Sequence, residues 1–88
     1  MTYTVVLVRD PGGAFCVGVP ALKGCNTEGQ SLPEALDMAR EAIELYLACL
    51  VDRGEPVPTD VETVTFDWFG GSEAFVYKLD VREPGLSA

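Results

Sequence analysis

The feature that most constrains this chain is one long amphipathic segment between a signal that starts a helix and a signal that stops it. Ser31 is a favoured N-cap residue, and Glu34 completes a capping box in which its carboxylate reaches back to the Ser31 N–H. Gly54 is a natural residue just past a helix end, and Pro56 prevents continuation. The pattern predicts a helix over residues 32–53, about 33 Å long at 1.5 Å per residue.

Apolar residues recur along this segment at helical spacing, so one face of the helix must be covered. They are Leu32, Ala35, Leu36, Ala39, Ala42, Ile43, Tyr46 and Leu50. The chain has 88 residues, enough for one small domain, so the cover must be a small sheet built from the rest. A second apolar set lies off this stripe and contacts either later strands or another subunit: Met38, Leu45, Leu47 and Cys49.

Five extended segments have the composition and alternation of strands: residues 3–9, 14–19, 24–29, 61–69 and 74–81. The first segment carries apolar residues on both faces, so it is a central strand or one of its faces meets another subunit. The order is β-β-β-α-β-β, an α+β fold in which one long helix packs on an antiparallel sheet. We expect a single domain over residues 1–83 and a short C-terminal tail over residues 84–88.

The charge balance restricts the partners of the chain. Fourteen acidic and six basic side chains give a net charge of −8. Affinity for nucleic acid rests largely on Lys and Arg, and an anionic membrane surface would repel an acidic chain. A basic protein would be attracted, although acidity also simply keeps proteins soluble. The helix carries an acidic face that is either solvated or binds such a partner: Glu34, Asp37, Glu41 and Glu44.

Residues needed for most catalytic chemistry are missing. The chain has no histidine, which excludes Ser-His, Cys-His and His-metal sites. Three cysteines without a C-x-x-C pattern, and no secretion signal, indicate a reduced cytoplasmic chain. Cys25, near the helix start, is either a thiolate stabilised by the helix dipole or, as we expect, a small buried side chain.

Acidic residues near the ends of elements are the sequence's only candidate for a Mg²⁺ site. Asp10 opens a turn, Glu28 lies in a polar segment and Glu34 belongs to the capping box. These local roles account for all three carboxylates. We therefore predict no metal site, no cofactor and no enzymatic activity.

The segment from Val19 to Ala35 reads Val-Pro-x-Leu-x-Gly-Cys-x-Thr-x-Gly-x-Ser-x-x-Glu-Ala. Together with helix residues 39–46 and the run 54–58, it resembles the HicB-like antitoxin family. The resemblance is close over residues 3–58. We interpret its motif residues as structural: Pro20, Gly24, Cys25, Thr27, Gly29, Ser31, Glu34 and Ala35.

The resemblance implies a degraded RNase H-like fold without nuclease activity. It also implies that the chain binds and neutralises a small basic mRNA-cleaving toxin, a HicA-like protein, if one is encoded nearby. The net charge of −8 suits that partner. Family members often carry a DNA-binding domain after the last strand, whereas this sequence stops at Ala88. Direct DNA binding is therefore not expected from this chain alone.

A second hypothesis is an orphan self-associating structural or interaction domain with no toxin and no enzymatic activity. Its motivation is the apolar surface beyond what one sheet face requires. The candidate contact residues are Val6 and Val8 on the first strand and Met38 and Leu45 on the helix. The two hypotheses are compatible, and we expect a homo-oligomer in either case.

Overall fold

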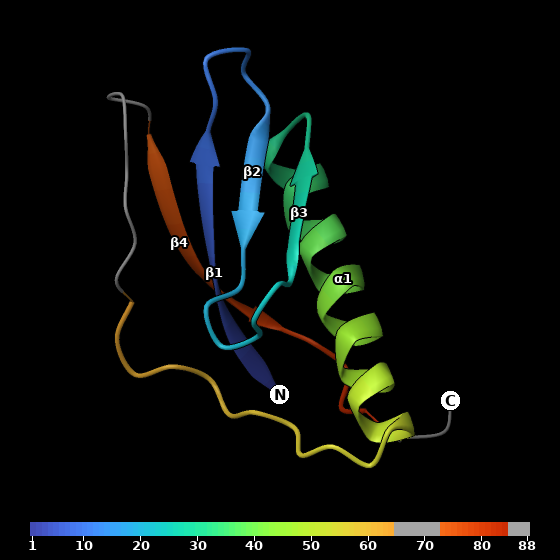
Figure 1. Ribbon diagram of the computed structural model, residues 1–88. Coiled ribbons are helices and arrows are strands. Elements are labelled where there is room, and N and C mark those ends of the chain that lie inside the picture. The colour runs from blue at the N-terminus through green and yellow to red at the C-terminus, as the bar shows by residue number, and fades with distance from the viewer. Residues whose placement is uncertain (65–72, 85–88) are drawn as a thin grey trace.

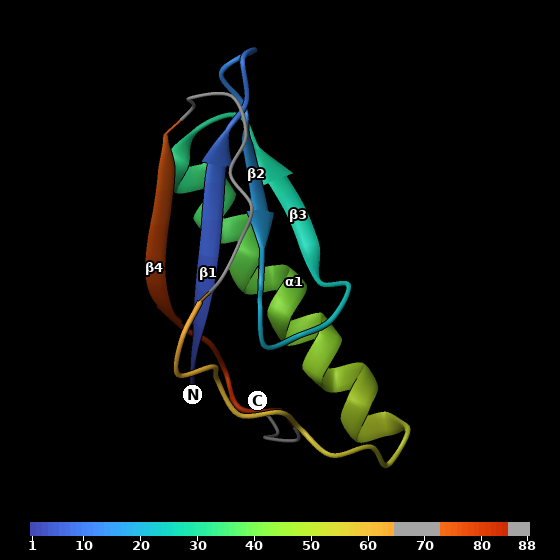
Figure 2. The ribbon, with the colours of Figure 1, turned by 60° about the vertical axis from the view of Figure 1, so that its left-hand side comes forward.

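The computed structural model describes residues 1–64 and 73–84 (Figure 1). Its elements are β1 (Thr2–Arg9), β2 (Phe15–Gly18), β3 (Asn26–Gly29), α1 (Leu32–Asp52) and β4 (Ala74–Asp80). The strands form one antiparallel sheet in the order β3-β2-β1-β4, and α1 covers one face of it (Figure 2). The predicted α+β class, with one long helix on an antiparallel sheet, is confirmed.

Strand β1 is the central strand that its two apolar faces predicted. It pairs with β2 through Val6–Arg9 and with β4 through Thr2–Val8. On the helix side its alternating side chains are fully buried, while Thr4 on the opposite face is only 1% exposed. Burial of this strand on both faces makes it the main source of hydrophobic stabilisation in the sheet. The core contains Tyr3, Val5, Leu7, Phe15, Val17, Val19, Leu22, Ala35, Ala39, Ile43, Leu47, Leu79 and Val81.

The turn from β3 into α1 brings two backbones into direct contact. A Cβ atom placed on Gly29 would lie 2.5 Å from the backbone nitrogen of Ala35, so only glycine fits there. Ser31 caps the helix as predicted, because its Oγ accepts from the Glu34 N–H at 3.3 Å. The Glu34 carboxylate, however, accepts from the Gln30 N–H at 3.2 Å rather than from the N–H of Ser31. The Gln30 N–H follows the end of the β2–β3 ladder, where no strand offers it an acceptor.

Helix α1 ends one residue before the predicted boundary, with Arg53 as its C-cap. The Arg53 N–H still donates to the Cys49 carbonyl, and the Gly54 N–H donates to the Val51 carbonyl. The second apolar set of the helix, which lies off the main stripe, contains both buried and exposed residues. Leu47 is fully buried, whereas Met38 is 39% and Leu45 is 65% exposed.

The sequence predicted two strands after the helix, and the first of them, over residues 61–69, is wrong at its start. Residues 61–64 form no strand, and the remainder of that predicted strand, with its turn at 70–72, lies outside the described residues. The chain after α1 passes the N-terminal end of β1 instead of pairing along it (Figure 2). There the Tyr3 hydroxyl donates to the Pro58 carbonyl, and Asp60 binds β1 through its side chain.

Asp60 substitutes for a missing strand at this point. Strand β2 pairs with β1 only from Val6 onward, so the Thr4 N–H lies beyond that ladder and donates to Asp60 Oδ1 at 2.8 Å. The other oxygen, Asp60 Oδ2, accepts from the Thr4 hydroxyl at 2.8 Å and from Lys78 Nζ at 2.9 Å. One carboxylate thus joins β1, β4 and the connection between α1 and β4. Buried or half-buried polar groups satisfied in this way hold a single arrangement.

Replacing Gly29 by alanine is expected to destabilise the protein, because the new methyl group overlaps the backbone at Ala35. Overpacking of this kind costs about 1–3 kcal/mol of unfolding free energy. The matched control is Gly18→Ala, whose Cβ would meet only Asn26 Oδ1 at 3.5 Å. Urea unfolding should show a large loss for Gly29→Ala and little change for Gly18→Ala. Equal stability of the two variants would contradict the close contact.

Replacing Asp60 by asparagine is expected to lower the unfolding free energy by about 1–3 kcal/mol, because its charged hydrogen bonds are lost. Burial alone would raise the pKa of Asp60, but hydrogen bonds from Thr4, Lys78 and the Val61 N–H outweigh it and lower the pKa below its ordinary value. The stability it contributes is therefore present above the unfolded pKa of about 3.9 and lost as the pH falls through the folded value.

Urea unfolding between about pH 5 and pH 2 measures this contribution. The wild-type chain should lose stability over that range more steeply than Asp60→Asn does. Asp37→Asn makes the same chemical change on a side chain that is 79% exposed, and should leave the slope close to that of the wild type. Parallel curves for wild type and Asp60→Asn would show that the carboxylate does not hold the connection.

Candidate functional site

The motif residues of the sequence form the passage from β2 through β3 into α1. Backbone hydrogen bonds close this passage, since the Val19 N–H donates to the Cys25 carbonyl and the Cys25 N–H donates to the Leu22 carbonyl. Gly24 has a φ of 80°, which side-chain-bearing residues rarely adopt. Thr27 lies on the helix side of β3, in register with Val17 of β2. These contacts place the motif residues in the turns that join β2, β3 and α1.

Cys25 is a packing residue of this passage. It is 6% exposed and belongs to the core. Burial raises the pKa of its thiol, which is the opposite of what a thiolate stabilised by a helix dipole requires. The other two cysteines, Cys16 and Cys49, are exposed, and no two of the three are joined by a disulfide.

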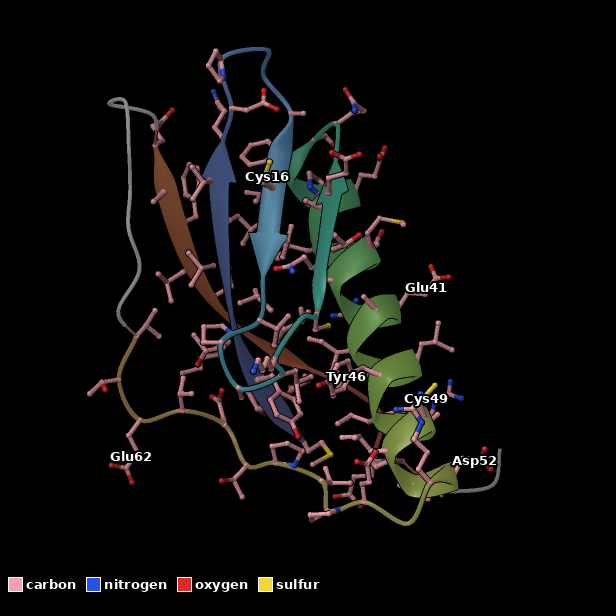
Figure 3. All side chains as sticks on the ribbon, viewed as in Figure 1. Cys16, Glu41, Tyr46, Cys49, Asp52 and Glu62 are labelled. Carbon is pink, nitrogen blue, oxygen red and sulfur yellow. The ribbon has the colours of Figure 1, made fainter. Side chains whose placement is uncertain are left out.

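The four acidic residues predicted as one helix face have different surroundings. Glu34 belongs to the helix cap, Asp37 forms an exposed ion pair with Arg40 at 3.6 Å, and Glu44 Oε2 accepts from the Arg82 N–H at 2.8 Å. Within the part of the chain that the structure describes, Glu41 makes no hydrogen bond or ion pair. It points away from the sheet, on the same side of α1 as Asp52 (Figure 3). Glu41 is therefore the member of the set whose charge is free for a partner.

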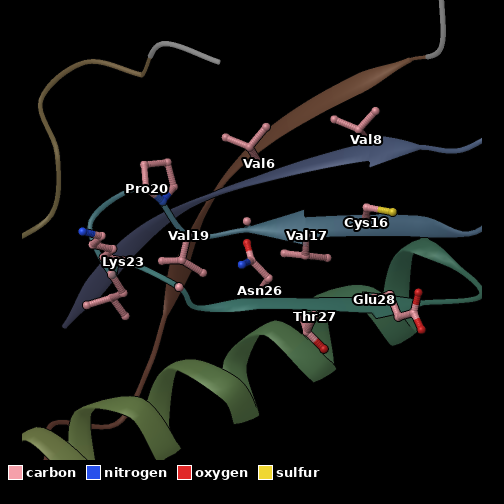
Figure 4. Close-up of a pocket in the computed structure, with 13 residues that line it drawn as sticks. Val6, Val8, Cys16, Val17, Val19, Pro20, Lys23, Asn26, Thr27 and Glu28 are labelled. Carbon is pink, nitrogen blue, oxygen red and sulfur yellow. The ribbon is translucent and has the colours of Figure 1, made fainter. Parts of the chain in front are cut away.

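The candidate self-association residues lie on two separate surfaces. Val6 and Val8 belong to the face of the sheet opposite α1, where they line a shallow groove of about 830 Å³ with Cys16 (Figure 4). Met38 and Leu45 lie on α1, in the other layer. The structure therefore does not join the four residues into a single contact surface.

A second groove, of about 510 Å³, runs between α1 and the start of β3. Leu45 and Cys49 line it from the helix, and residues 24–26 line it from the strand side. The Tyr46 hydroxyl donates to the Lys23 carbonyl at 2.9 Å and ties the helix to the passage before β3. This surface combines an exposed apolar row with a strand at the sheet edge.

Two of the three carboxylates considered for Mg²⁺ have local partners. Asp10 Oδ1 accepts from the Ala14 N–H at 3.1 Å in the β1–β2 turn, and Glu34 closes the helix cap. Among residues 1–64 and 73–84, no three His, Cys, Asp or Glu side chains gather closely enough to hold a metal ion. No helix in the same ranges has both the length and the apolar character needed to cross a membrane.

Local sequence patterns did not reveal two contacts that hold the second half of the chain. Asp60 in the connection after α1 pairs with Lys78 of β4, and the Arg40 Nε–H donates to the Asp80 carbonyl at 3.1 Å. The only signal available was an acidic residue after a proline-rich turn and a lysine within an alternating strand. Neither pattern specifies a partner many residues away.

Proteins with similar sequences are UPF0150 proteins. The chain is 43% identical to one from Thermoplasma acidophilum over 60 residues, which is 68% of this chain and 87% of the relative. It is 40% identical to one from Synechocystis over 58 residues, which is 66% of this chain and 73% of the relative. The similarity thus extends over most of both relatives.

Solved structures with the same fold are antitoxin domains and toxin–antitoxin complexes. The N-terminal domain of Burkholderia pseudomallei antitoxin HicB has a TM-score of 0.64 at 22% identity, covering 92% of this chain and all of that one. A chain of a toxin–antitoxin complex from Streptococcus pneumoniae has a TM-score of 0.77 at 20% identity, covering 93% of this chain and 69% of that one. A chain of the HicA3 and HicB3 complex has a TM-score of 0.65 at 18% identity, covering 93% and 99%.

The sequence model described as HicB_like antitoxin of bacterial toxin-antitoxin system matches residues 3–75 of this chain. That range includes β1 from Tyr3 onward, β2, β3, the helix and the start of β4. The chain therefore belongs to the HicB-like antitoxin family.

Proposed function

We propose that this chain is the antitoxin component of a toxin–antitoxin pair, and that it binds and neutralises a small basic mRNA-cleaving toxin of the HicA type. The observation that carries the proposal is the family match over residues 3–75. The same fold also occurs in chains of two solved toxin–antitoxin complexes. Neutralisation by binding requires no catalytic group on the antitoxin.

Electrostatics support a basic partner. The chain carries a net charge of −8, and the free carboxylate of Glu41 lies on the exposed side of α1 with Asp52 (Figure 3). Charges at the rim of an interface act mainly on the rate of encounter, by steering a partner of opposite sign. A basic ribonuclease that must be inactivated quickly is suited to this mode of recognition.

The proposal is tested by mixing the purified chain with a HicA-like protein, if one is encoded beside it. We expect a stable complex by size-exclusion chromatography and loss of RNA cleavage at equimolar ratio. No complex and undiminished cleavage would contradict the proposed function. The chain alone should cleave neither RNA nor RNA/DNA hybrid.

Reversing the charge of Glu41 tests the role of the acidic helix face. Glu41→Lys is expected to slow association with the toxin several-fold and to weaken its dependence on salt, because local steering is lost. The control is Glu62→Lys, an exposed position away from the helix (Figure 3). Each reversal changes the net charge by two, from −8 to −6.

Stopped-flow or surface plasmon resonance at two salt concentrations measures both variants. A larger effect of Glu41→Lys places the steering charge on α1. Equal effects of the two variants would show that only the total charge matters, and no effect of either would move the binding surface away from the helix.

Self-association without a toxin is the alternative function. Exposed apolar side chains favour it, namely Leu45 at 65% and Val76 at 53% exposure, which lie on different layers of the molecule. Light scattering of the purified chain, with and without the toxin, separates the two functions. A discrete oligomer that does not bind the toxin supports self-association as the function, whereas a chain that binds the toxin supports the antitoxin function.

A further inference from the structure

Among the described residues, strand β3 has no pairing partner along its outer edge. It is the outermost strand on its side of the sheet, and its register pairs Val17 with Thr27 and Phe15 with Gly29. The Val19 N–H donates to the Cys25 carbonyl at 3.2 Å, which identifies these odd-numbered pairs as the hydrogen-bonded ones. The backbone groups of the two alternate residues, Asn26 and Glu28, therefore point away from β2.

Nothing in the described residues covers this edge. No backbone or side-chain group within residues 1–64 and 73–84 bonds the main chain of Asn26 or Glu28. Edge strands are commonly protected by proline or lysine, and β3 has neither, whereas β4 at the opposite edge carries Lys78. The β3 edge is short, but its outward N–H and C=O groups can form hydrogen bonds with an added strand.

The exposed apolar row of α1 lies beside this edge. Leu45 and Cys49 line the groove of about 510 Å³ whose strand side includes Asn26. Met38 lies seven residues before Leu45, on the same side of the helix. A strand added about 4.8 Å beyond β3 would direct every second side chain toward this row. The edge and the helix row therefore form one surface, in which backbone bonding and apolar contact occur together.

The acidic side chains near this surface favour a basic partner over a second copy of the chain. Glu28 on the strand and Glu41 and Asp52 on the helix are all exposed. A basic residue that lines the groove, Arg53, is paired with Glu55 at 3.8 Å. A second copy of the chain would bring another −8 charge against it. A basic strand with alternating apolar residues is attracted by the carboxylates and fills the groove beside Leu45.

We infer that the β3 edge is the docking site for an extended strand of a basic protein partner, which continues the sheet and packs its apolar side chains on the Met38, Leu45 and Cys49 row. This inference rests on the proposed antitoxin function, because it assigns the surface on which the toxin would be held. Strand addition supplies affinity through the main chain, while the helix row and the carboxylates select the sequence.

Glu28→Pro tests the backbone part of the surface. Proline removes the outward N–H and places its ring on the free edge, but it removes no bond of the β2–β3 ladder. The preceding residue, Thr27, is already extended, as a residue before proline must be. Glu28→Gln is the matched control, because it removes the same charge and keeps the N–H. We expect Glu28→Pro to raise the Kd for the HicA-like toxin at least tenfold and Glu28→Gln to change it much less.

Leu45→Gln tests the apolar part independently of the strand. Its control is Val51→Gln, which changes an apolar helix residue that is 43% exposed and does not line the groove. We expect the Leu45 variant to bind the toxin several-fold more weakly than the Val51 variant. Circular dichroism and urea unfolding establish that all four variants are folded.

Amide hydrogen exchange gives a direct readout of strand addition. In the free chain the Thr27 and Gly29 amides should exchange slowly and the Asn26 and Glu28 amides rapidly. In the complex all four should be protected, because the added strand accepts from the outward N–H groups.

The outcomes separate this inference from the proposed function. Failure of the wild-type chain to bind the toxin contradicts both. Normal binding by Glu28→Pro and Leu45→Gln, with no new protection at Asn26 and Glu28, overturns the docking site and leaves the antitoxin function standing. Conversion of an oligomeric chain to a monomer by Glu28→Pro, with toxin binding unchanged, shows that the occupant is a second copy and also overturns the inference.

Discussion

The contact between the backbones of Gly29 and Ala35 is the constraint on which the arrangement of the two layers depends. Because no side chain separates them, α1 begins directly against the end of β3 and runs along that side of the sheet (Figure 1). The helix is consequently displaced toward the β3 edge, where its solvent-facing row borders a strand whose outward main-chain groups have no partner in the described part of the chain. A larger residue at either position would move the helix and separate these two features.

A second constraint acts at the opposite end of the sheet. Tyr3 and Thr4 in β1 are buried, yet β2 does not extend far enough to pair with them. The connection after α1 fills this place with the Pro58 carbonyl and the Asp60 carboxylate. A loop therefore completes the hydrogen bonding of the central strand, and Lys78 links the same carboxylate to β4. The fold needs both layers and this connection to satisfy the polar groups of β1.

Local patterns predicted the features whose cause is local. The cap at Ser31 and the apolar spacing of α1 place the helix within one residue of its observed end, because capping and periodicity act within a few residues. The first three strands follow from alternation and turn residues. Residue size and position between elements also led to the interpretation of the glycine and cysteine motif as structural, and in the structure Gly29 lies against Ala35 and Cys25 is buried.

Features that depend on distant partners could not be predicted in this way. Residues 61–64 alternate like a strand, but their course is set by Asp60, which bonds Thr4 from 56 residues away. The four acidic helix residues share a face by spacing, yet Glu44 is occupied by the Arg82 N–H, 38 residues away, and only Glu41 remains free among the described contacts. The free edge of β3 required the sheet order, which the sequence leaves open.

The pairing of β1 with β4 also has a consequence for how the protein is made. Thr2 lies opposite Asp80, 78 residues away, and the N-terminal amino group donates to the Val81 carbonyl at 3.1 Å. Closing so long a loop carries an entropic cost that precedes any gain from the contacts it forms. During synthesis, β1, β2, β3 and α1 emerge from the ribosome before β4 does. The sheet is therefore completed only after β4 has emerged, and until then one side of its most apolar strand is open to mispairing and to proteolysis.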